Sequence, residues 1–132
     1  MPARNPINFF RVLLAAGSAL LANAIAYAIG SAAGATWDVG MPFKVGIAMV
    51  IGATLAPMVL GALVARFAAA RWAKSQSWFA WGVLALAVVS APGGLVSSPN
   101  LATGISLAAM HVVVGLAWFW AIKPVKKSEQ TA

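Results

Sequence analysis

Cysteine is absent from the 132 residues, and acidic residues are nearly absent, with two Asp and Glu in total. The lack of cysteine excludes a disulfide scaffold. Charged residues make up only 8% of the chain, against about a quarter in an average soluble domain. A soluble domain of this size has a large solvent-exposed surface, which needs polar and charged groups. The shortage of charge therefore excludes a soluble enzyme, and the high apolar content described next excludes a disordered tail.

Hydrophobic residues fill most of the remaining sequence, at 62% of the chain with a mean hydropathy of +0.90. They fall into four runs near the length of roughly 20 residues that a helix needs to cross a hydrocarbon core of about 30 Å. Lipid offers no partner for backbone polar groups, so helix is the expected conformation. We predict an all-α, polytopic four-transmembrane-helix bundle, a single domain over 1–132, with spans at about 12–34, 45–65, 77–96 and 101–122.

The nine Lys and Arg residues are distributed very unevenly between the joints. Lys44, with Asp38 nearby, lies between the first two runs, whereas the others share the opposite side: Arg4, Arg11, Arg66, Arg71, Lys74, Lys123, Lys126 and Lys127. By the positive-inside rule, both termini are expected in the cytoplasm. The net charge of +7 thus indicates orientation rather than a nucleic-acid partner.

The basic side is also a candidate site for lipid. We expect about 1 kcal/mol of attraction to anionic headgroups from each basic residue near the surface. The predicted anchors are Arg66, Arg71, Lys74, Lys123, Lys126 and Lys127.

The start of the chain has a second interpretation. Arg4 and Arg11 precede an apolar run that holds the small-residue triplet 26–28, which imitates a signal peptide with its cleavage site. Because the apolar run continues through Gly34, retention as a first span is the favoured prediction.

Polar side chains within the runs are few: Ser18, Asn23, Tyr27, Thr54, Ser90, Thr103, Ser106 and His111. Each run places one of them at or near its midpoint, namely Asn23, Thr54, Ser90 and His111. We expect these four to form one polar layer across the bundle. Two interpretations stay open: the layer is hydrogen-bonded packing between closely approaching helices, or it is a functional site.

His111 is the single histidine and the strongest candidate in that layer. Proton-coupled transport is disfavoured because no acid or lysine lies within a run. No catalytic triad is expected either, since Asp38 and Glu129 lie outside the runs. One histidine without cysteine cannot assemble a zinc site or bis-histidine haem ligation. We predict no enzyme, no metal and no cofactor, with ligation of a haem or chlorophyll-type ring by His111 as a minor alternative.

Two prolines interrupt the middle runs. Pro57 and Pro92 each remove one backbone hydrogen bond and are expected to kink their helices. Because Gly93 and Gly94 follow Pro92, the third helix has a second possibility, an end near Ala91. In that case Ser98 is the N-cap of the next helix and Pro99 its first residue.

The layout of Asn23, the basic joint 66–74, the segment Ser90-Ala91-Pro92 and the segment 107–111 resembles small four-span membrane proteins of actinobacteria whose domains have no known function. The resemblance implies a bacterial inner-membrane location and brings no activity.

Two functions remain open. The favoured hypothesis is a non-catalytic interaction protein, either an accessory subunit of a larger membrane complex or a homo-oligomer, because four helices of this length barely enclose a cavity. The alternative is a small-molecule transporter or a ligand- or pigment-binding protein that uses the polar layer around His111.

Overall fold

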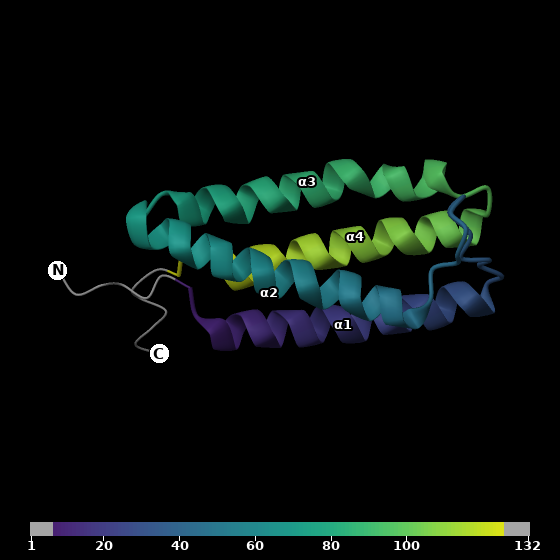
Figure 1. The fold of residues 1–132 in the computed structure, drawn as a ribbon, viewed down its shortest axis with the longest axis horizontal. Coiled ribbons are helices and arrows are strands. Elements are labelled where there is room, and N and C mark those ends of the chain that lie inside the picture. The colour runs from purple at the N-terminus through teal and green to yellow at the C-terminus, as the bar shows by residue number, and fades with distance from the viewer. Residues whose placement is uncertain (1–6, 126–132) are drawn as a thin grey trace.

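The computed structural model describes residues 7–125, and in that part of the chain all regular structure is helical. The four helices follow one another in alternating directions (Figure 1). Their bounds are α1 Phe9–Ala32, α2 Ile47–Arg71, α3 Ser75–Ser97 and α4 Leu101–Ile122. Each helix is long and apolar enough to cross a membrane. The predicted all-α four-helix bundle is confirmed, and the chain is a multi-pass membrane protein.

The prolines lie inside continuous helices rather than at breaks. Pro57 belongs to α2 and Pro92 to α3, and both are exposed on the outer surface of the bundle. The expected alternative of a third helix that ends near Ala91 is wrong, because α3 continues to Ser97. In lipid, an early end would leave several backbone groups without partners, whereas the proline removes one bond.

The start of α4 also differs from the prediction. Asn100, not Ser98, is the N-cap, and its Oδ1 accepts from the backbone N–H of Thr103 at 2.8 Å. The Asn100 amide donates to the carbonyl of Gly34 at 3.2 Å. An asparagine caps as well as a serine does, and here the same side chain also ties α4 to the connection after α1. Ser98 accepts from the N–H of Asn100.

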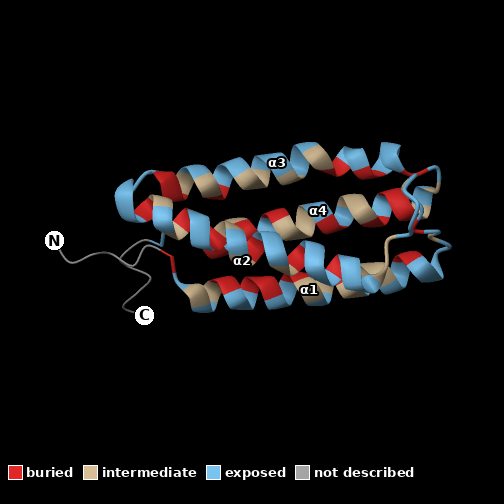
Figure 2. Ribbon diagram, in the orientation of Figure 1, coloured by how far each residue is buried: buried red, intermediate tan, exposed pale blue. Residues whose placement is uncertain are grey.

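Helix α4 is the centre of the bundle and packs closely on α3 and on α1, while α2 packs mainly on α1. The larger core cluster lies near the end at which α1 begins and α4 finishes. There Trp118 is buried beside Ala62, Ala65 and Ala80. Small residues dominate this core, so the backbones approach closely, and the burial pattern follows the inward-facing stripes of the helices (Figure 2).

Two glycines set the distance between α3 and α4. A Cβ atom on Gly94 would lie 3.1 Å from the backbone nitrogen of Ala108, and one on Gly104 would lie 3.0 Å from the Cα of Leu95. Backbone atoms cannot move aside as a flexible side chain can. These contacts therefore need glycine at both positions. Gly93, one residue away, meets nothing within 4 Å.

This contrast generates a matched prediction. We expect Gly94→Val to lower the free energy of unfolding by about 1 to 3 kcal/mol, because it forces α3 away from α4. Gly93→Val should change it by less than about 0.5 kcal/mol, since its side chain enters open space. Unfolding of both variants in mixed micelles with increasing dodecyl sulfate measures the difference. Equal losses for the two variants would contradict the close glycine contact.

Candidate functional site

One hydrogen bond joins two helices at mid-membrane level. Asn23 of α1 donates from Nδ2 to Oγ1 of Thr54 on α2 at 2.9 Å, and each residue is 2% exposed. The Thr54 hydroxyl in turn donates to the carbonyl of Val50 at 2.7 Å. This pair holds the middle of α2 against α1.

The pair leaves one buried acceptor unmatched. Asn23 Oδ1 has no hydrogen-bond partner within the described residues, although it lies inside the bundle. The Thr54 proton is already given to Val50, so rotating the amide would only exchange one unmet group for another. A buried amide oxygen without a donor carries a free-energy cost of about 1 to 3 kcal/mol.

His111 does not point into the same core. Its side chain is exposed, and Nδ1 lies 2.8 Å from the carbonyl of Leu107 on its own helix. Because a carbonyl only accepts, this contact assigns the proton to Nδ1 and leaves a lone pair on Nε2. Across residues 7–125, nothing donates to that nitrogen.

Ser90 is half-buried and donates to the carbonyl of Ala87 in its own helix at 3.2 Å. The expected polar layer of four residues is therefore wrong in part. Asn23 and Thr54 meet, whereas Ser90 and His111 each bond to their own helix.

His111 is exposed, whereas Leu107 and Val114 on the same side of α4 are half-buried. His111 and Trp118 are seven residues apart, nearly two turns, and share one side of α4. Trp118 is covered by α2, where a Cβ on Gly61 would meet its ring at 2.9 Å. Farther along, α2 and α3 diverge and α4 is visible between them (Figure 1). We call this stretch of α4, from Leu107 to Val114 on the His111 side, the open face.

The basic residues gather at the end of the bundle where α1 begins. Arg66 lies over the ring of Phe9, with 5.3 Å from its Cζ to the centroid, and Arg71 lies over Phe67 at 3.9 Å. Lys74 is exposed and Lys123 half-buried, while the predicted anchors Lys126 and Lys127 lie outside the described residues. Guanidinium stacking on aromatic rings keeps these charges at an interface.

Three structural residues at this same end escaped the sequence reasoning. Arg11 donates to the carbonyl of Trp120, Gln76 donates to that of Ile122 at 2.8 Å, and the Trp118 indole N–H donates to that of Phe79 at 2.9 Å. A lone glutamine at the start of an apolar run was the available signal for Gln76. These bonds lock the helices together at the basic end.

The side chains of this region take part in hydrogen bonds. Among residues 7–125, no three His, Cys, Asp or Glu side chains come together to hold a metal ion. Asp38, the acid in this range, lies in the connection between α1 and α2.

A family described as a family of unknown function, DUF6069, matches residues 3–128. The chain belongs to DUF6069. This agrees with the resemblance to four-span proteins of unknown function. No curated protein and no solved structure matches the chain. The function of this DUF6069 protein must therefore be argued from its own side chains.

The Asn23–Thr54 pair leads to a prediction whose sign is unusual. Thr54→Val should destabilise the bundle by about 1 to 2 kcal/mol, because it leaves the whole Asn23 amide buried without a partner. Adding Asn23→Leu to that variant should recover at least half of the loss, since no buried polar group then remains.

Unfolding in dodecyl sulfate measures both values, with Ser18→Ala as the control because Ser18 is exposed on the same helix. A double variant less stable than Thr54→Val alone would show that the pair is not the relevant interaction.

Proposed function

We propose that this DUF6069 protein is a non-catalytic membrane subunit whose open face packs against a transmembrane helix of another chain, either a second copy or a partner protein. The observation that carries the proposal is the lone pair of His111 Nε2, which lies at mid-length of α4 on an exposed surface. Lipid tails offer no donor to such a group, whereas a serine, threonine or asparagine of a neighbouring helix does.

Packing supports the same proposal. Four helices normally close a bundle around one core, but here α2 meets α4 closely near Trp118, and His111, two turns away on the same side of α4, is exposed. A further helix laid along the open face would complete the packing. Such polar contacts between helices in lipid contribute about 0.6 kcal/mol on average and up to about 2 kcal/mol. His111 would therefore select the partner, and van der Waals packing would hold it.

The transport alternative requires polar side chains along a route enclosed by the helices. Two of its four proposed residues, Asn23 and Thr54, bond to each other inside the bundle.

The ligand-binding alternative has a specific observation in its favour. The bond from Nδ1 to Leu107 is the arrangement that orients a metal-ligating imidazole, with Nε2 directed outward. Titration of the nanodisc-embedded protein with haemin tests it, and a shifted Soret band that His111→Leu abolishes would support ring ligation at His111.

For the subunit proposal, we expect the protein in mild detergent to exceed its monomer mass of 13.5 kDa, whether with a copy or a partner. His111→Leu should reduce the fraction in the complex severalfold while the monomer keeps its thermal stability, because the imidazole is exposed. Native mass spectrometry measures the masses and distinguishes a copy from a partner.

Leu116→Ala is the matched control, since Leu116 is 56% exposed on the opposite side of α4. It should leave the complex intact. A wild-type protein that stays monomeric in both detergent and nanodiscs, or a complex that survives His111→Leu, would contradict the proposal.

We also propose that the basic end faces the cytoplasm and contacts anionic lipid headgroups. Arg66, Arg71 and Lys74 support this orientation, with Lys44 at the opposite end. The natural absence of cysteine makes the test direct.

Phe43→Cys and Ala73→Cys place one thiol at each end, at exposed positions and without a change of charge. In intact cells, we expect a membrane-impermeant maleimide to label Phe43→Cys strongly and Ala73→Cys only after the cells are opened. The reverse pattern would invert the orientation.

A further inference from the structure

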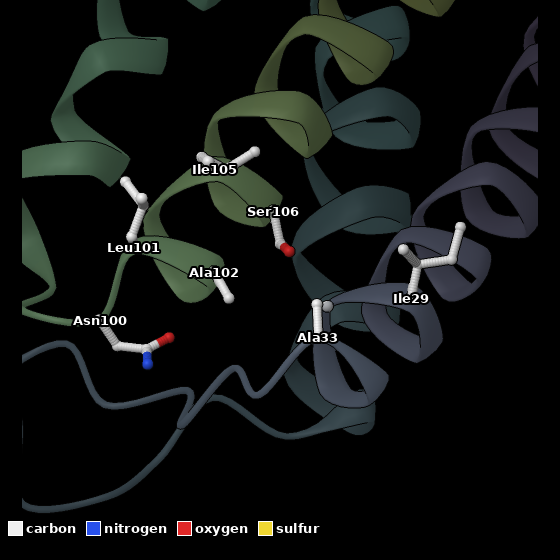
Figure 3. Close-up of a pocket in the computed structure, with 8 residues that line it drawn as sticks. Ile29, Ala33, Asn100, Leu101, Ala102, Ile105 and Ser106 are labelled. Atoms are coloured by element: carbon white, nitrogen blue, oxygen red, sulfur yellow. The ribbon is translucent and has the colours of Figure 1, made fainter.

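A groove of about 490 Å³ lies between the last turn of α1 and the first turns of α4, at the end of the bundle opposite the basic residues. Figure 3 shows side chains of the two helices facing each other across it. Its volume falls within the range of sites for small molecules, about 300 to 1,000 Å³. The groove lies on a different side of α4 from the open face.

The walls of this groove are apolar and carry no charge. Ile29 and Ala33 line it from α1, and Leu101 and Ile105 line it from α4. All four are exposed to the surroundings of the bundle, so the groove opens toward lipid. Asp38 and Lys44 are not among its lining residues. An ionised group would find no partner in it.

One hydroxyl in the groove is free. Ser106 is only 8% exposed, and its oxygen points into the space between α4 and α1 (Figure 3). Among the described residues, nothing forms a hydrogen bond with it. Asn100, at the mouth of the groove, is by contrast engaged with Thr103 and Gly34. The groove thus presents a single unused donor to its occupant.

The back wall of the groove, behind this hydroxyl, is closely packed. A Cβ atom on Gly30 would collide with the Ser106 oxygen and lie 3.0 Å from the ring of Trp37. Trp37 is fixed in turn, because its ring stacks on Tyr27 with centroids 4.3 Å apart and its backbone N–H donates to Thr103 Oγ1 at 3.0 Å. Ser106 is therefore held against a closely packed and rigid back wall.

We propose that this groove binds the carbonyl-bearing, uncharged part of a lipid, whose carbonyl oxygen accepts a hydrogen bond from Ser106 and whose hydrocarbon lies along Ile29 and Ile105. A hydroxyl inside an apolar site favours an acceptor. The absence of charge in the walls favours a neutral one over a phosphate. An ester carbonyl of a phospholipid and a ring carbonyl of an isoprenoid quinone share this chemistry.

The test compares two phosphatidylglycerols with the same chains, one ester-linked and one ether-linked, because the ether form lacks the carbonyls. Native mass spectrometry of the full-length protein measures how much of each lipid is retained. For the wild type, we expect about three- to tenfold tighter binding of the diester, the range of one hydrogen bond. Ser106→Ala should bind the two lipids equally, and Ser18→Ala, an exposed serine outside the groove, should keep the preference.

A second variant and a second probe complete the design. Ala102→Phe should reduce diester retention at least as much, because the ring fills the groove that Ala102 lines. Decylubiquinone is the second probe. If it displaces the diester lipid from the wild type but not from Ser106→Ala, a quinone is the preferred source of the carbonyl. If it does not displace the diester lipid from the wild type, the ester is the preferred source. Equal binding of diester and diether lipids by the wild type, or a preference that survives Ser106→Ala, would overturn the proposal.

Discussion

The hydrogen bond between Asn23 and Thr54 is the constraint on which the arrangement of the bundle depends. In a soluble protein such a pair would be one polar contact among many. In lipid, an amide and a hydroxyl that separate find no water molecules to serve as new hydrogen-bond partners. The bond therefore holds the middle of α2 to α1. Nearer the basic end, α2 contacts Trp118 of α4. Helix α2 crosses the bundle obliquely (Figure 1), and His111 of α4 stays exposed.

The two ends of the bundle are held more firmly than its middle. At the basic end, Gln76 and Trp118 bond to backbone carbonyls across α3 and α4. At the other end, Asn100 and Trp37 connect α4 to the segment after α1. Polar side chains near helix ends can satisfy the carbonyl and amide groups that helix termini leave free. Away from the ends, Thr54, Ser90 and His111 each bond to a carbonyl of their own helix, and Asn23 bonds to the side chain of Thr54 on the neighbouring helix.

The sequence could predict positions along the helices but not their rotation. The run 101–122 coincides with α4, and His111 lies at its midpoint, whereas Thr54 lies five residues before the midpoint of α2 because that helix continues to Arg71. Whether such residues meet depends on which side of each helix faces the core. Because apolar residues occupy every side of these helices, the hydrophobic pattern says little about that side. Lipid-facing and core-facing positions are equally hydrophobic here, unlike in a soluble helix. The alternative of a helix end near Pro92 was wrong for a separate reason, because in lipid an early helix end leaves more backbone groups unpaired than one lost bond does.

Ser106 and His111 show how such a small chain can encode two separate contacts. They lie five residues apart on α4, a rotation of about 140° around the helix axis, so they face different surroundings. Ser106 presents a free donor in a narrow groove, and His111 presents a free acceptor on an open surface. A donor in a groove that no helix can enter suits a slender lipid carbonyl, whereas an acceptor on a broad bare face suits a whole helix. Because one ligand cannot reach both, lipid binding and subunit packing can be lost independently, each by a single substitution.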